Sequence, residues 1–315
     1  MLAPMRVKTT AWALPCVLLA AACTSKAIEG GADPEKQLTM LEGRFLDAFN
    51  KGDAGALAGL FAEDGVRVIS GAQLPSAGRA QLEALFEADI AEHNANRDNT
   101  LSSEVQATRM FDGGIMLADG AFELKDKDGA TLLGGKWGCV YRQTAEGLEV
   151  VMESAHVAKD TLKEPVDFAK VERQAASAAD FGDAGKYVDA MNNLIAAYGE
   201  GMKAGDAAKI AGLFTEDGIQ LVGSSSEPHR GRAAIQAALK SILPEGGYAG
   251  TDLKGTILGM NKVSDNLLCA NGQWQVAGDD GAVLEFGQWG NLMEIQDDGS
   301  LLLIMESAGP LHVAK

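Results

Sequence analysis

The chain has 315 residues, a formal net charge of −17 at pH 7 and a hydrophobic fraction of 46%. So large an excess of acidic groups repels nucleic acid and anionic lipid surfaces, so we expect neither as a partner. The apolar content is ordinary for a globular protein, and the length suits two domains of common size.

The first 22 residues have the pattern of a secretory signal peptide. Arg6 and Lys8 form a short basic start, and an apolar run from Ala11 leads to three alanines that end at Ala22. About a dozen apolar residues are too few to cross a membrane as a stable helix. We therefore expect residues 1–22 to be removed on export.

Cys23 directly follows these alanines, and Leu19-Ala-Ala-Ala-Cys23 resembles a bacterial lipobox, although Ala20 stands where leucine is usual. Lipidation of Cys23 is the favoured interpretation, because a reactive terminal thiol is a liability in an exported protein. With Thr24 next, the resemblance implies an outer-membrane lipoprotein that faces the periplasm and meets the membrane only through this anchor. The alternative is ordinary cleavage and a soluble periplasmic or secreted protein.

One stretch of the sequence occurs twice, 153 positions apart. Residues 50–65 return as residues 203–218, with Gly-Asp, Leu-Phe and Glu-Asp-Gly at matching places, and Gly78-Arg79-Ala80 returns as Gly231-Arg232-Ala233. Self-similarity of this length indicates a tandem duplication. We expect a tether over 23–34, a first domain over 35–159, a linker over 160–185 and a second domain over 186–315.

Each copy is expected to begin with helices. Asp33-Pro34-Glu35 has the chemistry of a helix start, and apolar residues at helical spacing follow up to Phe49. Gly52 ends this helix, and Asp53 caps a second, short one that extends to Phe61. Residues 63–65 then predict a turn into a strand over 66–69, and Ser76 is expected to cap a third helix.

The remainder of each copy is expected to form strands. Apolar stretches separated by turn signals predict strands over 103–110, 114–125, 130–144 and 148–155, and in the second copy near 219–222, 253–261, 266–276, 282–295 and 301–308. Three helices before such a meander predict an α+β domain, with the helices on one face of a curved antiparallel sheet.

The helix that ends in Gly-Asp, the Leu-Phe-x-Glu-Asp-Gly turn, the Gly-Arg-Ala helix start and Gly135-Lys136-Trp137 before the last strand together resemble one family. They are similar to the SnoaL-like and DUF4440 branches of the nuclear-transport-factor-2-like (NTF2-like) superfamily, over 35–158 and 186–313. The resemblance implies two cone-shaped domains with mostly apolar pockets, paired through their sheets as an internal pseudo-dimer. Because the superfamily includes isomerases, cyclases, dehydratases, hydrolases and non-catalytic binding domains, function must be argued from the site.

The second copy also resembles ketosteroid isomerase, whose chemistry needs a carboxylate base and two hydrogen-bond donors for an enolate oxygen. The resemblance places the base at Val222, with Ile69 as its counterpart in the first copy. An aliphatic side chain cannot accept a proton, so ketosteroid isomerisation is not expected.

The same resemblance places the two donors at Tyr198 and Asn291, against Phe45 and Cys139 in the first copy. The second copy thus keeps two polar groups that could hold a carbonyl oxygen. The equally weighted alternative is that Tyr198 lies at the pocket rim and Asn291 faces solvent.

Two glutamates are the remaining acid–base candidates. Glu153 and Glu306 both stand in Met-Glu-Ser-Ala on the last strand of their copy. A glutamate buried in a pocket could act as acid or base, but an alternating strand with its glutamate outward is the favoured interpretation. Trp137 and Trp289, also equivalent, could form an aromatic wall for a ligand, with core or inter-copy packing as the preferred alternative.

Other polar residues are given structural roles. His156 and His312 are expected at the surface, and we expect no metal and no cofactor. Arg79 and Arg232 are expected to pair with the acids of the Glu-Asp-Gly turns. Cys139 and Cys269 are expected to be free, buried thiols.

Taken together, these features favour an exported, lipid-anchored protein that binds a small apolar or amphipathic molecule, or a protein partner, without catalysis. The residues expected in the pockets are Tyr198, Asn291, Trp289, Trp137, Val222 and Ile69. The competing hypothesis is an isomerase, cyclase or hydrolase that uses Glu306 or Glu153, and a carboxylate inside the pocket near Tyr198 would favour it. A third is a structural envelope protein whose pockets are filled by side chains.

Overall fold

The computed structural model describes residues 33–157 and 181–311, except residues 224 and 246. The expected signal peptide, Cys23, nearly all of the tether, most of the linker and His312 lie outside these residues. Within the described part of the chain, no helix combines the length and the apolar character that a membrane crossing needs.

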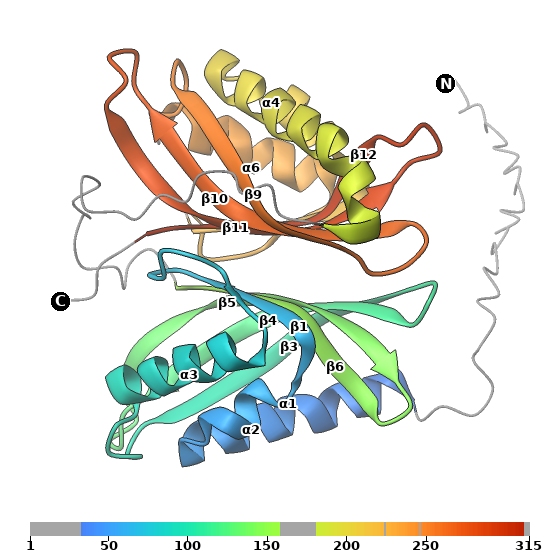
Figure 1. Cartoon of the computed structure of the whole chain (residues 1–315). Coiled ribbons are helices and arrows are strands. Elements are labelled where there is room, and N and C mark those ends of the chain that lie inside the picture. Colours follow the sequence, from blue (N-terminus) through green and yellow to red (C-terminus); the bar gives the residue numbers. More distant parts are fainter. Residues whose placement is uncertain (1–32, 158–180, 224, 246, 312–315) are drawn as a thin grey trace, which may run out of the picture. The chain divides into compact units, whose positions relative to one another are not determined.

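Apart from a 3-10 helix, η3, at the start of the second copy, both copies fold into the same succession of elements (Figure 1). The first comprises α1 (Pro34–Lys51), α2 (Ala54–Ala58), β1 (Phe61–Ile69), β2 (Ser76–Ala77), α3 (Arg79–His93), β3 (Thr100–Phe111), β4 (Ile115–Lys125), β5 (Thr131–Thr144) and β6 (Gly147–Val157). The second comprises η3 (Gly182–Tyr187), α4 (Val188–Ala204), α5 (Ala207–Ala211), β7 (Phe214–Val222), β8 (His229–Arg230), α6 (Arg232–Glu245), β9 (Asp252–Lys262), β10 (Leu267–Ala277), β11 (Val283–Ile295) and β12 (Leu301–Pro310). The predicted α+β class with two tandem domains is confirmed.

The two sheets have the same topology. The strand order is β2-β1-β6-β5-β4-β3 in the first sheet and β8-β7-β12-β11-β10-β9 in the second. The consecutive strands of each meander pair antiparallel, whereas β1 lies parallel to β6 and β7 lies parallel to β12. This parallel pair places residues near the start of each copy beside residues near its end.

The helix boundaries follow from local chemistry. Gly52 ends α1 in the left-handed conformation at φ 71°, which glycine adopts without a steric penalty. The Asp53 side chain then accepts a hydrogen bond from the Ala56 amide and caps α2. Gly205 and Asp206 repeat both features in the second copy.

The first strand of each copy is longer than the sequence suggested. Phe61 belongs to β1 and not to the preceding helix, and the expected turn over residues 63–65 is an irregular stretch inside this strand. Ser76 belongs to the two-residue strand β2, which pairs with β1, so α3 begins only after Gly78 at φ 81°. Pairing with a distant strand therefore overrides the local turn signal.

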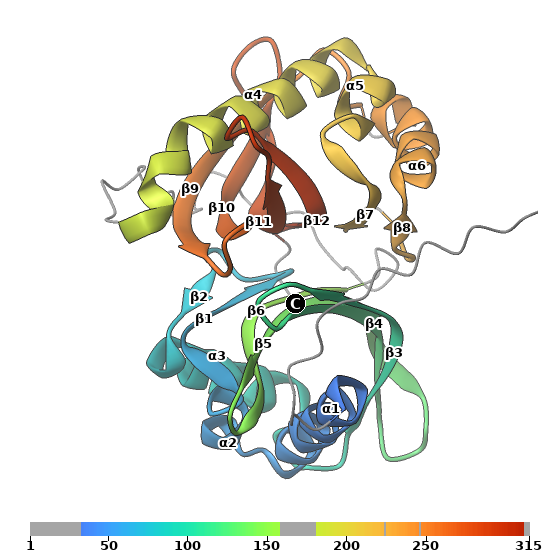
Figure 2. The same cartoon turned by 90° about the vertical axis from the view of Figure 1, so that its right-hand side faces the viewer.

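The helices lie on one face of each sheet. In the first domain α1 and α3 cover that face, and in the second α4 crosses the sheet while α6 lies beside β7 and β8 (Figure 2). An apolar cluster fills the space between helices and sheet in each domain. These two layers enclose the cavities described below.

A third apolar cluster involves the opposite faces of both sheets. Its members come from both domains: Val66, Val68, Ile115, Leu117, Val140, Val151, Met152, Ile219, Leu221, Leu267, Cys269, Leu292, Ile304 and Met305. Polar contacts accompany it, among them an ion pair between Arg230 and Asp119 and hydrogen bonds from Gln288 to the carbonyls of Ile69 and Ala72. The strands that contribute to this cluster are therefore buried on both faces of their sheet.

Candidate functional site

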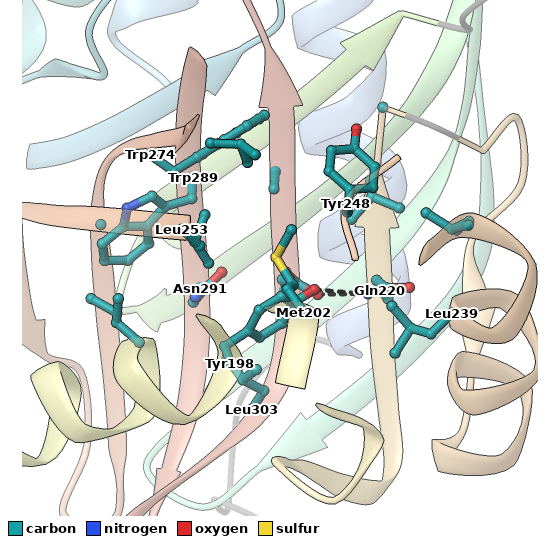
Figure 3. A pocket seen from close by; sticks show the side chains of 18 of the residues that line it. Tyr198, Met202, Gln220, Leu239, Tyr248, Leu253, Trp274, Trp289, Asn291 and Leu303 are labelled. Carbon is teal, nitrogen blue, oxygen red and sulfur yellow. Dashed lines mark hydrogen bonds between the residues drawn. The ribbon is translucent and has the colours of Figure 1, made fainter. Parts of the chain in front are cut away.

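The second domain encloses a cavity of about 200 Å³ between α4, α6 and the sheet (Figure 3). Most of its wall is apolar, from Met191, Leu194, Ile195, Met202, Leu239, Ile242, Leu243, Leu253 and Leu303, with Trp274 and Trp289 on one side. The polar side chains on the wall are Tyr198, Gln220, Tyr248, Glu285, Asn291 and Glu306. None of these lining residues is a lysine, an arginine or a histidine.

Glu306 is the buried carboxyl group of this cavity, with 7% of its surface exposed. Gln220 Nε2 donates a hydrogen bond of 2.8 Å to Glu306 Oε2, and the Tyr198 hydroxyl also hydrogen-bonds to this carboxyl group. Burial raises the pKa of Glu306 to about 7, although both hydrogen bonds favour the charged form and act against this rise. The carboxyl group can therefore hold or release a proton near neutral pH.

Gln220 links Glu306 to a histidine at the edge of the site. His229 Nδ1 lies 3.1 Å from Gln220 Oε1, and since an amide oxygen can only accept, Nδ1 carries the proton of this contact. Gln220 Nε2 also lies 3.4 Å from the Tyr198 hydroxyl oxygen. The amide thus fixes the positions of the two groups that face the cavity.

Asn291 and Trp289 are held in place from neighbouring strands. Asn291 is buried, and its Oδ1 accepts a hydrogen bond from the Ser307 amide. The Trp289 indole donates to the Gln273 carbonyl at 3.1 Å, and the ring lies over Gly272, where a Cβ atom would meet it at 2.8 Å. The solvent-facing alternative for Asn291 is therefore wrong, and Trp289 is both a core residue and part of the cavity wall.

The first domain has an equivalent cavity of about 140 Å³. Here the counterpart of Glu306, Glu153, receives a hydrogen bond of 3.1 Å from Arg67 Nε, and Arg67 Nη1 lies 2.5 Å from Asp89 Oδ2. Burial lowers the pKa of Arg67, but the two carboxylates outweigh this effect and raise it above its ordinary value. The guanidinium group is therefore positively charged, and Glu153 and Asp89 are its partners inside the cavity.

A third carboxyl group, from α1, faces the first cavity. Glu42 accepts a hydrogen bond of 2.9 Å from the Tyr141 hydroxyl, and burial raises its pKa despite this bond. Trp137, Phe45, Ile69 and Cys139 also line this cavity. The two cavities thus share their architecture but differ in the chemistry of their polar groups.

Both glutamates face the cavities, so the expectation that they point outward is wrong. The reason is that the outer face of each sheet is also buried: Met152 and Met305, next to the glutamates, lie in the cluster between the sheets. Alternation along the strand therefore does not reveal which face meets solvent. Val222 and Ile69 line the two cavities as aliphatic residues.

His156 is not a surface residue. It is 1% exposed, with Nδ1 3.1 Å from Ser70 Oγ and Nε2 2.5 Å from Ser307 Oγ of the second domain. Burial lowers its pKa to about 3, so the imidazole is neutral at physiological pH. The sequence predicted an exposed position because His156 lies at the end of its strand. Its burial depends on contacts with the other copy, such as that with Ser307.

The helix-start arginines have partners that the sequence identified only in part. Arg232 pairs with Glu216, as expected, but Arg79 and Arg232 also donate to the main-chain carbonyls of Phe61 and Phe214. The carbonyl contact is the one that both copies share. Each arginine therefore ties its helix to the start of the neighbouring strand.

Sequence reasoning missed the polar partners of the glutamates, Gln220, Arg67 and Asp89. A signal was available, because Arg67 and Gln220 are polar residues at equivalent places in otherwise apolar strands. Cys139 and Cys269 are free and buried, as expected. Among the described residues, no three His, Cys, Asp or Glu side chains gather closely enough to hold a metal ion.

Residues 187–277, in the second domain, match the family model described as the SnoaL-like domain. This stretch is similar to the SnoaL-like domain. It contains Tyr198, Gln220 and Trp274 of the cavity, whereas Glu306 and Asn291 lie beyond it. The first domain, which lies outside this match, has the same strand order as the second.

Solved structures similar to the chain include an NTF2-like protein with a cystatin-like fold from Novosphingobium aromaticivorans, at 17% identity, with 39% of this chain and 81% of that chain covered and a TM-score of 0.33. A ketosteroid isomerase-like protein from Erwinia carotovora atroseptica matches at 16% identity, with 40% and 98% covered and a TM-score of 0.33. A domain of unknown function with a cystatin-like fold from Nostoc punctiforme matches at 16% identity, with 39% and 76% covered and a TM-score of 0.35. No curated protein matches the sequence.

Proposed function

We propose that the SnoaL-like second domain binds a small, mostly apolar molecule with one polar group, and that this group meets Glu306, Tyr198 and Asn291. The observation that carries the proposal is the cavity of about 200 Å³, whose wall is apolar except for a few side chains that converge on one region. Binding sites for small molecules typically combine an apolar wall with a few placed polar groups.

The proposal is tested by filling the cavity. Val222→Phe adds a ring inside the second cavity, and Ile69→Phe adds one at the equivalent place in the first. We expect Val222→Phe to weaken the binding of an apolar fluorescent probe to the purified protein at least tenfold. Ile69→Phe should leave the affinity of the second cavity for this probe unchanged. Equal binding by the wild type and both variants would contradict a ligand site in this cavity.

A second candidate function is acid–base catalysis by Glu306, as in an isomerase, cyclase or hydrolase. The observation that favours it is the position of Glu306 inside the cavity beside Tyr198, together with a pKa raised to about 7 by burial. Deuterium exchange from heavy water into an apolar ketone, followed by NMR, tests this candidate. We expect Glu306→Gln to abolish exchange, and equal rates for variant and wild type would exclude Glu306 as the base.

Export and anchoring at Cys23 belong to the same proposal and are supported by the basic start, the apolar run and the lipobox-like Leu19-Ala-Ala-Ala-Cys23. Mass spectrometry of the protein purified from its host's membranes tests them. We expect a diacylglyceryl mass at the new N-terminus, and Cys23→Ser should move the protein to the soluble fraction. A membrane-bound Cys23→Ser variant would contradict the anchor.

The two copies are proposed to act as an internal pseudo-dimer. Its support is a set of contacts that repeat with the copies exchanged: Lys136 donates to the Val222 carbonyl, and Gln288 donates to the Ile69 carbonyl. Since Lys136 and Gln288 are equivalent, each domain holds the strand end that borders the other domain's cavity.

A further inference from the structure

Because the domain is duplicated, the partners of the glutamate on the last strand can be compared between the two copies. In the first domain Glu153 lies opposite Arg67 across the parallel strand pair, and in the second Glu306 lies opposite Gln220 in the same register. The two glutamates are therefore the same position of one ancestral site, and the residue opposite each of them marks where a partner group sits.

In the first domain that partner is a cation supplied by the protein. The Arg67 guanidinium lies between Glu153 and Asp89, and its carbon atom is 4.4 Å from the centroid of the Phe86 ring. The buried carboxylate is thus paired with a cation, and this cation in turn packs against an aromatic ring.

The second domain has the carboxyl group without the cation. Gln220 replaces Arg67, and Ile242 stands at the position of Asp89, so both the guanidinium and its second acid are replaced by uncharged side chains. The described residues that line the cavity include no lysine, arginine or histidine. Ionised Glu306 therefore carries a charge that no side chain on the wall neutralises.

The wall around Glu306 suits the body of an organic cation. Trp274, Trp289, Tyr198 and Tyr248 present aromatic surfaces, and the rest is aliphatic or methionine. Aromatic rings attract ammonium groups, more strongly where water is excluded. The net charge of −17 also favours the approach of cations over anions.

We propose that the cavity of the second domain binds a small organic cation, a protonated amine with an apolar body, whose ammonium group pairs with Glu306 as the Arg67 guanidinium pairs with Glu153. This inference rests on the proposed ligand-binding function and specifies its ligand class. Glu306 takes the role of the counter-ion, and Gln220 and Tyr198 position its carboxyl group.

Binding should then depend on pH through Glu306. The groups that face it are Tyr198 from α4, Gln220 from β7 and Asn291 from β11, with His229 behind Gln220. The same cavity is also lined by Glu285 from β11, which accepts a hydrogen bond from the Tyr248 hydroxyl. Because burial raises the pKa of Glu306 to about 7, the amine must displace a proton below this pH. Affinity for an amine should therefore rise about tenfold from pH 6 to pH 8, whereas affinity for a neutral analogue should not rise.

Three probes of one shape test the proposal by isothermal titration calorimetry of the purified protein: 3-phenylpropylamine, 3-phenyl-1-propanol and 3-phenylpropionate. We expect the amine to bind at least tenfold more tightly than the alcohol at pH 8, and the carboxylate to bind most weakly. If the alcohol binds as tightly as the amine, the cation proposal fails while the ligand-binding function stands. If no probe binds, both fail.

Variants that supply the missing charge make the test specific. Gln220→Arg should lower amine affinity at least tenfold, because the guanidinium group of the introduced arginine would pair with the Glu306 carboxylate in place of the amine. If the single variant folds poorly, the double variant Q220R/I242D takes its place in the test. It reproduces the pairing of Arg67 with Glu153 and Asp89 in the first domain and should lower amine affinity to the same extent. Glu306→Gln should remove both the preference for the amine and its pH dependence. Unchanged amine binding in folded Q220R/I242D would overturn the proposal.

Discussion

At Glu306, burial and hydrogen bonding act on the carboxyl group in opposite directions. Removal from water disfavours the charge, while the Gln220 and Tyr198 hydrogen bonds favour it, and the first effect is larger. Glu153 has the same backbone position, and burial raises its pKa too, but there Arg67 adds a full opposite charge. The residue opposite the glutamate, Arg67 in one copy and Gln220 in the other, thus determines whether a cation of the protein faces this carboxyl group.

This difference predicts how stability depends on pH. The folded protein keeps a proton on Glu306 up to about pH 7, whereas the unfolded chain loses it near the ordinary value of 4.5. The folded state therefore binds more protons between these values, so the contribution of Glu306 is fully present below 4.5 and is lost as the pH rises through 7. The loss amounts to about 3 kcal/mol at most.

Glu306→Gln removes this loss, because an amide does not titrate. Urea unfolding between pH 5 and pH 8 should show the variant gaining stability relative to wild type as the pH rises. Glu87→Gln, at an exposed position on α3, is the matched control and should show no such trend. A Glu306→Gln difference that stays constant over this range would contradict the buried, protonated carboxyl group.

At the scale of elements, the repeated Gly-Asp pair sets the angle between the first two helices of each copy. Gly205 ends α4 at φ 64°, and Asp206 Oδ1 accepts hydrogen bonds from the amides of Ala208 and Lys209. The short helix α5 that follows carries Ile210, which is fully buried. A five-residue helix has little stability of its own, so its cap matters.

Asp206→Ala should therefore reduce the free energy of unfolding by about 1 kcal/mol, since two amide groups lose their acceptor. Asp206→Asn keeps an acceptor oxygen and should lose less than half of that. Chemical denaturation of the two variants provides the measurement. Equal losses would indicate that the charge of Asp206, and not its capping bonds, stabilises the helix.

For the whole molecule, the faces of the sheets that point away from the helices determine whether the copies unfold together. Leu221 and Met305 of the second sheet lie against Gly138 of the first, where an added Cβ would meet them at 2.3 and 2.8 Å. On the other sheet Gly290 meets Val68 and Met152 in the same way. Glycine at both positions lets the sheets approach closely.

Leu221→Asp places a charge in this apolar cluster and should weaken the contact between the domains by several kcal/mol. We expect one calorimetric unfolding transition for wild type and two for the variant, because each domain keeps its own core. Ala234→Asp, at an exposed position of α6, is the control for the added charge. A single transition in Leu221→Asp would contradict coupling through this cluster.

The sequence by itself determined the elements and their order. Helix caps, left-handed glycines and turns act over a few residues, so Gly52-Asp53 and its repeat, the hairpin turns and the strands between them could be located without a structure. The duplication and the SnoaL-like resemblance then fixed the fold class. Errors arose where a local signal competed with a distant partner, as at Ser76, which pairs with Arg67 in the sheet.

Only the tertiary structure decided which polar groups meet. Arg67 and Glu153 are 86 residues apart, and so are Gln220 and Glu306, and each pair forms because the first and last strands of a domain run parallel. The burial of His156 and the inward direction of both glutamates depend on the second sheet covering the outer face of the first. Sequence patterns report which residues are near each other along a helix or strand, whereas the charge balance of a cavity depends on contacts between strands far apart in the chain.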